Sequence, residues 1–228
     1  MLDTDRTLGE LVTATAGFRD EYSGLAAACR EAEPEDVRPR LVTVGSLDPL
    51  SCSWGMKPMR IAKQTWDRPV VESSLLEPRL AAWLDQQLRP KVVLPTQSKV
   101  FEPVVDRDGM LAPLTPVLAI HCPPEDLDLV AALLLAPPVV AWARRRWFGS
   151  AMSVQAIKLA ARDVGSLPLP ADAQAWSEAA GMISSAEHAG SEARSTAMAV
   201  AEVMNEAYRG TPDVLVWWLD RFGERPSG

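Results

Sequence analysis

The chain has 228 residues, of which 47% are hydrophobic and 23% are charged, and its formal net charge is −7. A chain of this length and composition can bury a hydrophobic core of its own, which argues against a disordered or a disulfide-stapled protein. Its cysteines, Cys29, Cys52 and Cys122, form no C-x-x-C pair, and the acidic N-terminus has no apolar signal core, so we expect no zinc ribbon and a cytoplasmic location.

The first third of the chain predicts loops, one helix and one strand. Gly17 and Gly24 flank an aromatic pair, which is typical of a tight loop, and we expect that loop to lead into a helix over 26–32. Residues 40–45 are β-prone and are bounded by proline and glycine, so they predict a strand. The stretch 46–66 shows no period, and we expect irregular structure there.

The middle of the chain predicts a helix and then three strands. Residues 77–88 carry apolar side chains on one helical face, whereas 91–94 is a short apolar run typical of a strand. Two further strands are expected at 99–105 and 114–120, on either side of the turn sequence 106–109, as in a hairpin. Prolines near the second of these strands favour a position at a sheet edge.

Helices dominate the remainder. Acidic residues after a proline predict a helix over 124–135, and the following proline pair ends it and begins a second helix over 138–147. A short helix is expected over 154–164. Through 171–228 the strand signals vanish, and apolar residues recur at three- and four-residue steps, which predicts a helical region.

Together these elements predict an α+β fold. We expect a small mixed sheet, mostly antiparallel, with packed helices over residues 1–170. A helical C-terminal region over 171–228 would follow it and is a candidate subunit-docking element.

No catalytic or metal-binding motif is present in the sequence. The only histidines, His121 and His188, lack ligand spacing, and Cys122 would point to the opposite face of a strand from its neighbour His121. No G-x-S-x-G, Walker loop or H-E-x-x-H occurs. The longest apolar run, 127–143, is too short and too interrupted to cross a bilayer, so we also expect no membrane partner.

Charge is distributed unevenly along the chain. Residues 1–37 hold three basic and nine acidic side chains, residues 38–170 hold sixteen and twelve, and residues 171–228 hold four and nine. The middle segment is therefore basic and both ends are acidic. Such asymmetry can separate a surface that faces a polyanion from surfaces that face other partners.

The order of segments across the basic middle resembles a known family. The segments are Lys91-Val-Val-Leu-Pro-Thr-Gln-Ser-Lys-Val-Phe-Glu-Pro-Val-Val-Asp-Arg-Asp-Gly109, the leucine-rich 127–143, Gly149-Ser-Ala-Met-Ser, Ile157-Lys-Leu and Leu167-Pro-Leu-Pro170. They resemble the C-terminal target-recognition (specificity) region of N6-adenine DNA methyltransferases, which also occurs in fused restriction-modification enzymes and in type I specificity subunits. Residues 40–45 with Trp54-Gly55 resemble the earlier part of that region, and the resemblance covers roughly 5–170.

The resemblance implies a DNA-recognition module without activity of its own. Its partners would be double-stranded DNA and a catalytic N6-adenine methyltransferase subunit or domain, and S-adenosylmethionine would bind on that partner. The proline pairs at 123–124 and 137–138 lack the amide and the aromatic residue of the adenine-methyltransferase motif, and no G-x-G follows a strand, so we expect no cofactor site and no catalytic residue on this chain. Because the chain starts within the recognition region, we expect a natural subunit, a truncated protein or an engineered piece. The alternative is a protein-interaction or regulatory subunit that keeps the fold without DNA readout.

Basic and aromatic residues interleave in the densest cationic stretch. Its basic side chains would hold DNA phosphates, or else they form a solvated loop. Its two tryptophans would stack on a base or wedge a base step, or else they belong to the core. These candidate DNA-binding residues are Trp54, Lys57, Arg60, Lys63, Trp66 and Arg68.

Two further groups are candidates for DNA contact. Gln97, Ser98 and Lys99 would read base edges from a loop between strands, since glutamine pairs with adenine and lysine with guanine, or they form an ordinary loop. Arg144 and Arg145 lie in the expected last turn of the second helix. They would contact DNA, or they interact with the negative end of the helix dipole.

Overall fold

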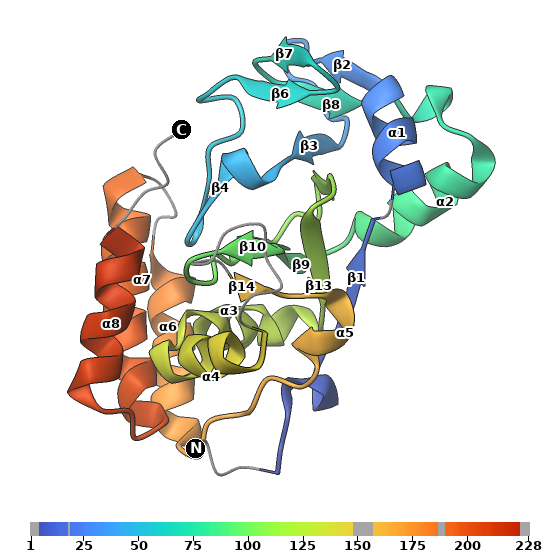
Figure 1. Cartoon of the computed structure of the whole chain (residues 1–228). Helices are drawn as coiled ribbons and strands as arrows, with labels where there is room; N and C mark the ends of the chain where they lie inside the picture. Colours follow the sequence, from blue (N-terminus) through green and yellow to red (C-terminus); the bar gives the residue numbers. More distant parts are fainter. Residues whose placement is uncertain (1–4, 18, 148–156, 187–189, 224–228) are drawn as a thin grey trace.

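The computed structural model describes residues 5–17, 19–147, 157–186 and 190–223. Two four-stranded sheets and the helices around them form an α+β fold, which confirms the predicted class (Figure 1). The first sheet has the order β1 (Thr13–Ala16), β13 (Val117–His121), β9 (Lys91–Pro95) and β11 (Val104–Asp106), with every pair antiparallel. The second has the order β12 (Leu111–Pro113), β3 (Arg40–Val42), β8 (Pro69–Val71) and β2 (Cys29–Glu31), in which only β12 and β3 are parallel.

Shorter elements complete the fold. Three two-stranded ribbons pair β4 (Leu47–Asp48) with β5 (Ser51–Cys52), β6 (Met59–Ile61) with β7 (Gln64–Trp66), and β10 (Gln97–Ser98) with β14 (Ile157–Lys158). Four short 3-10 helices are η1 (Leu8–Glu10), η2 (Val44–Ser46), η3 (Ser73–Leu75) and η4 (Pro124–Asp126).

The central strand β9 is buried on both faces, which explains its unbroken apolar sequence. Val92 and Leu94 belong to the large hydrophobic core, against which α3 (Leu127–Leu135) packs. Val93 points the other way, into a smaller cluster that includes Val42 of the second sheet. Successive side chains of a strand point to opposite faces, so β9 ties the helical layer to the second sheet.

Helix α3 is surrounded by protein, as expected for a helix that is apolar on all sides. It packs on β9 and β11 on one side and on α6 (Ala173–Ser185) and α7 (Gly190–Ala207) on the other. The indole nitrogen of Trp176 in α6 donates to the Leu129 carbonyl at 2.8 Å. The hydrophobic core therefore crosses the expected boundary at residue 170.

Two more helices flank this layer. Helix α4 (Pro137–Trp147) packs against α8 (Pro212–Gly223), which also contacts α7. Among the described residues no single helix is long and apolar enough to cross a membrane. The helices 124–135 and 137–147 meet that criterion only when they are counted together, and they are bent by 66° relative to each other. Both helices of the pair contribute buried side chains to the core.

The leucine-proline segment that ends the resemblance lies against the N-terminal segment. The backbone nitrogen of Leu8 donates to the Leu167 carbonyl at 2.8 Å, and that of Leu169 donates to the Arg6 carbonyl at 3.0 Å. The hydroxyl of Tyr208, at the end of α7, donates to the Pro168 carbonyl at 2.6 Å. Short helix α5 (Ala161–Val164) leads into this segment and packs on β1.

The second sheet is covered by α1 (Arg19–Ala27) and α2 (Pro78–Gln87), and here one prediction was wrong. The tight loop expected between the two glycines is a helix, and the helix expected over 26–32 gives way to strand β2. Gly24 lies inside α1, where a Cβ atom would come within 2.1 Å of Leu80 on α2. The glycine permits close helix packing and does not mark a turn.

Strand pairing around the turn 106–109 also differs from the prediction. Gly109 adopts the expected positive φ of 72°, but β11 pairs with β9, whereas β12 pairs with β3 in the other sheet. The expected strand over 99–105 is reduced to β11, and the one over 114–120 is the interior strand β13, so the edge placement was wrong for it. Strand β12, which contains Pro113, does lie at an edge of the second sheet.

The short helix expected over 154–164 is present in only half of its described part. Residues 157–158 form strand β14, and a helix is present only over 161–164. Residues 154–156 lie outside the described part of the chain.

Candidate nucleic-acid interface

A β-hairpin occupies the stretch in which irregular structure was expected. Strands β6 and β7 pair with Arg60 opposite Thr65, and both of these side chains are exposed. The neighbouring positions Met59 and Ile61 are buried at 5% and 1% exposure. Because side chains alternate along a strand, the hairpin presents one polar face to solvent and one apolar face to the second sheet.

The tip of this hairpin is built from residues that rarely adopt its geometry. Ala62 and Lys63 have φ angles of 49° and 68°, so both central residues of the two-residue turn are left-handed, as in a type I′ turn. Such turns favour Asn-Gly or Asp-Gly, and the left-handed conformation is strained for alanine and lysine. The Ala62 nitrogen donates to the Tyr22 hydroxyl of α1 at 3.3 Å, and this bond holds the tip with Lys63 exposed at its apex.

Four predicted DNA-binding side chains come together on the hairpin and its flanking segments. Lys57, Arg60, Lys63 and Arg68 are all exposed, and we call them the hairpin cluster. Asp67 is the only acidic residue between positions 54 and 68. In Figure 1 the hairpin forms an outer edge of the molecule, away from helices α3 and α4. The hairpin and its flanks thus present four exposed basic side chains, and the Glu31 carboxylate lies beside one of them, where it accepts from the backbone nitrogens of Asp67 and Arg68.

The two tryptophans beside the cluster are half-buried, and Trp54 has contacts within the fold. Its indole nitrogen donates to the Pro69 carbonyl at 2.8 Å, and the guanidinium groups of Arg40 and Arg68 lie 5.5 and 5.3 Å from its ring centroid. Trp66 packs against the cluster of apolar residues under α1 and α2. Stacking of either ring on a base stays a prediction.

The second predicted group belongs to a different part of the structure. Gln97 and Ser98 form strand β10, which pairs with β14 in the register Gln97 to Lys158 and Ser98 to Ile157. Both β10 residues and Lys99 are half-buried. They lie on a short ribbon beside the first sheet instead of the expected loop, and Figure 1 shows this ribbon apart from the β6–β7 hairpin.

The predicted arginines of α4 face another helix. Arg144 and Arg145 line a groove of about 550 Å³ together with Val214 and Trp217 of α8. Burial, followed by the positive charge of Arg221, lowers the pKa of Arg144. These arginines are at the end of α4, where the helix dipole favours positive charge, and the hairpin cluster is on the opposite side of the fold in Figure 1.

Comparison with known proteins gave no relative. The chain matches no protein-family model and no curated protein sequence.

Three titratable side chains, Cys29, Cys122 and His121, have pKa values shifted in favour of their neutral forms. Burial raises the pKa of the Cys29 thiol to about 11 and that of the Cys122 thiol to about 12, so neither is a thiolate nucleophile near neutral pH. Burial lowers the pKa of His121 to about 4. Within the described part of the chain, no three His, Cys, Asp or Glu side chains are placed to hold a metal ion.

Three residues of this surface were missed in the sequence. Gln64 and Thr65 lie on β7, and Tyr22 supports the turn from α1. The alternation of buried and exposed positions around Arg60 is a strand signal, but it covers only three residues. No glycine, asparagine or aspartate marks the turn, so the usual hairpin signature is absent.

Proposed function

We propose that the chain is a non-catalytic DNA sequence-recognition module of an S-adenosylmethionine-dependent N6-adenine DNA methyltransferase or restriction-modification system. The observation that carries DNA binding is the hairpin cluster, with Lys57, Arg60, Lys63 and Arg68 exposed on one supported hairpin. The assignment to adenine methylation rests on the resemblance of the segments in 91–170. The partner would bind the cofactor and supply the catalytic residues.

A two-stranded ribbon of this kind suits the major groove of DNA, which admits a helix or a β-ribbon. On the outward pair, Thr65 would face the base edges, where threonine contacts the thymine methyl group, and Arg60 would hold a phosphate beside them. Lys63 at the apex and Lys57 before the hairpin would hold phosphates and fix its register on the duplex.

The acidic helical region would serve the protein partner. Residues 171–228 carry nine acidic and four basic side chains, which disfavours contact with phosphates. The groove between α4 and α8 offers an apolar surface around Trp217 with arginines at its border. We propose this side of the molecule as the one that docks a catalytic methyltransferase subunit or domain.

The test is fluorescence anisotropy with duplex DNA over a range of salt concentrations, with and without a methyltransferase partner. Replacing Lys57, Arg60 and Lys63 by alanine should weaken binding to all sequences alike. Loss of three phosphate contacts should make the slope of log K against log salt shallower by about 2.7.

A matched variant removes three exposed arginines that lie on other elements. The control is Arg79→Ala/Arg162→Ala/Arg209→Ala, which removes the same charge and should leave the salt slope close to that of the wild type. Absence of binding at low salt, with or without the partner, would overturn the proposal. Equal weakening by both triple variants would show that only overall charge matters.

A further inference from the structure

Arginines and apolar side chains meet in the groove between α4 and α8, two helices that lie side by side in Figure 1. The groove has a volume of about 550 Å³, which lies in the range of ligand pockets, and most of its lining is apolar. The residues that line it are Ala141, Arg144 and Arg145 from α4 and Asp213, Val214 and Trp217 from α8. The groove thus offers apolar surface and positive charge together.

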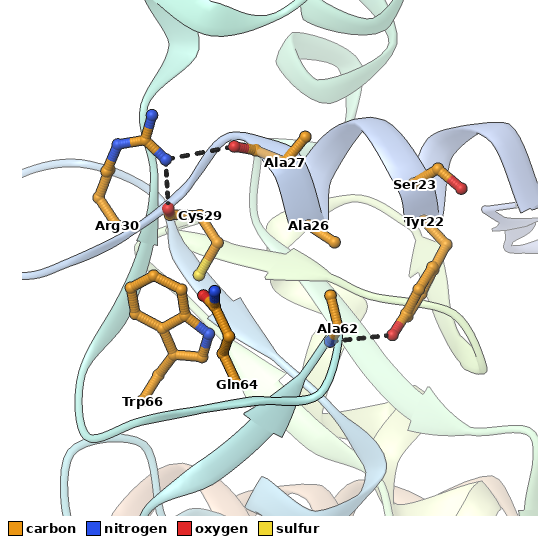
Figure 2. A pocket seen from close by; sticks show the side chains of 9 residues that line it. All are labelled: Tyr22, Ser23, Ala26, Ala27, Cys29, Arg30, Ala62, Gln64 and Trp66. Atoms are coloured by element: carbon orange, nitrogen blue, oxygen red, sulfur yellow. Dashed lines mark hydrogen bonds between the residues drawn. The ribbon is translucent and has the colours of Figure 1, made fainter.

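The hollow between α1 and the β6–β7 hairpin offers no such combination (Figure 2). Among the described residues that line it, only Arg30 is charged. Its guanidinium donates to the carbonyls of Ala27 and Cys29 at 3.2 and 2.6 Å, so this charge is directed at the end of α1. The Tyr22 hydroxyl on the same wall accepts from the Ala62 nitrogen at 3.3 Å. The groove between α4 and α8 is therefore the better candidate for a charged partner.

Aromatic rings and arginines lie together on the surface around this groove. The guanidinium of Arg221 lies 4.6 Å from the ring centroid of Trp217 and donates to the Trp217 carbonyl at 3.2 Å. On α4 the guanidinium of Arg146 lies 4.3 Å from the ring centroid of Trp142. Both rings are half-buried, and Val216 beside Trp217 is 62% exposed. Tryptophan and arginine are enriched among the residues that dominate the binding energy of protein interfaces, so this composition favours a protein partner.

The charges at the groove favour a partner that carries carboxylates. Burial lowers the pKa of Arg144, and the positive charge of Arg221 lowers it further, because the two guanidinium groups repel each other. Arg145 adds an exposed guanidinium to the lining, in which Asp213 is the only carboxylate among the described residues. A carboxylate brought to these arginines would relieve the repulsion and accept strong charge-assisted hydrogen bonds.

Duplex DNA matches this surface less well than an acidic protein segment does. Helix α8 belongs to the region 171–228, which carries nine acidic and four basic side chains and would repel phosphates along the rest of a duplex. The outer surface of a duplex consists mainly of charged phosphates and sugars, and it presents no large apolar group that would cover Val214 and Trp217.

We propose that the groove binds an acidic segment of a protein partner, which places one large apolar side chain against Val214 and Trp217 and its carboxylates on Arg144 and Arg145. The inference rests on the proposed function, in which this side of the molecule docks the catalytic partner, and it names the chemistry by which the partner is held. Binding of the segment does not require DNA.

The first experiment measures peptide binding by fluorescence anisotropy. The probe is a labelled, capped peptide with a central phenylalanine between runs of glutamate. It should bind the wild type saturably with a Kd below about 1 mM. Replacing the phenylalanine by alanine, or the glutamates by lysines, should each weaken binding at least about tenfold, because the first removes the apolar contact and the second reverses the charge.

Protein variants locate the bound peptide. Arg144→Glu/Arg145→Glu should weaken binding at least about tenfold. The matched control Arg79→Glu/Arg162→Glu makes the same change of charge at exposed positions of α2 and α5 and should bind as the wild type does. The triple alanine variant of the hairpin cluster should also keep peptide binding, which shows that the acidic peptide is not held by the basic hairpin.

Two further measurements do not depend on removing the arginines. Ala141→Phe fills the groove, leaves its charges in place and should weaken peptide binding. Indole NH resonances of ¹⁵N-labelled protein are followed during the peptide titration, and the Trp217 signal, assigned by its loss in Trp217→Phe, should shift. Thermal melts of each variant confirm folding.

The outcomes separate this inference from the proposed function. Peptide binding that depends on the groove, in a protein that binds no duplex, would refute the DNA module and support the groove. Duplex binding without saturable peptide binding at about 1 mM would support the module and overturn the inference. Loss of duplex binding, but not of peptide binding, in Arg144→Glu/Arg145→Glu would show that these arginines hold DNA, and would also overturn it.

Two other results would overturn the inference. Equal weakening of peptide binding by both double glutamate variants would show that only overall charge matters. Self-association of the wild type in size-exclusion chromatography that Ala141→Phe abolishes, together with absence of a Trp217 shift by the peptide, would assign the groove to a second copy of the chain.

Discussion

Between pH 7 and pH 5, one buried side chain, His121, should lower the stability of the protein relative to a variant that does not titrate at this position. This residue ends β13 and is 5% exposed. Its Nδ1 atom accepts a hydrogen bond from Nε of Arg89 at 3.1 Å, and its Nε2 atom lies 3.2 Å from Oε1 of Gln87. The same Gln87 oxygen accepts from the hydroxyl of Thr15 at 2.9 Å. A second proton on the ring would have to sit on Nδ1, against the cationic Arg89.

The size of the effect follows from the two pKa values. Burial, and then the charges of Arg89 and Lys91, lower the pKa of His121 from 6.5 to about 4. Between these values the unfolded state binds more protons than the folded state, so the free energy of unfolding falls as the pH falls. Stability linked to this group is therefore present above pH 6.5 and is lost as the pH falls toward 4. Linkage gives a loss of about 2 kcal/mol between pH 7 and pH 5.

Urea unfolding at pH 7 and pH 5 measures this loss, with His121→Gln as the reference. Glutamine still accepts from Arg89 but does not titrate, and the other titrating groups are common to both proteins. Among them, burial raises the pKa of Asp106 to about 6 and that of Glu102 to about 7. The wild type should lose about 2 kcal/mol more than the variant over this range. Equal losses in the two proteins would refute the reasoning.

The remaining predictions concern a buried ion pair of the first sheet and the tip of the β6–β7 hairpin. Lys91 and Asp106 form a fully buried ion pair, so Lys91→Met should cost about 3–5 kcal/mol and lower Tm by about 6–20 °C, whereas Lys91→Met/Asp106→Leu should restore most of that stability. A double variant no more stable in thermal melts than the single one would contradict this. Ala62→Gly should raise stability to urea by about 0.5–1 kcal/mol, because it relieves a left-handed alanine, and Ala82→Gly in α2 should lower it by about 1 kcal/mol. If the two glycine variants changed the free energy of unfolding in the same direction, the result would rule out strain at the hairpin tip.

The helices were predictable because each carries a long periodic signal. The apolar face of α2, the proline break between α3 and α4, and the apolar steps of α6 to α8 all span several turns. Hydrophobic periodicity over several turns makes a helix recognisable in the sequence, although packing of the apolar face provides most of its stability. In α1 the local signal failed, because Gly24 packs against the Leu80 side chain of α2, a partner that is distant in sequence, and does not mark a turn.

The strand partners and the arrangement of the candidate site were harder to predict from the sequence. The chain from 111 to 121 supplies strands to two different sheets, and such pairing depends on the whole topology instead of on the turn at 106–109. The basic residues of the hairpin cluster were predicted from composition alone. The hairpin that carries these residues was not predicted. Its two strands pair over only three residues each, and its turn contains Ala62 and Lys63 in place of glycine, asparagine or aspartate, so the usual sequence signals of a hairpin are missing.

The position of α3 has a consequence for protein engineering. Because this helix is covered by the sheet on one side and by α6 and α7 on the other, the segment from 173 to 223 is part of its environment and not an appended tail. A graft that transplants residues 5–170 alone would leave the leucines of α3 facing water and the Trp176 indole contact unmade. Any chimera that exchanges this region between proteins should keep its junctions outside residues 5–223, so that the transferred surface keeps the whole hydrophobic core that supports it.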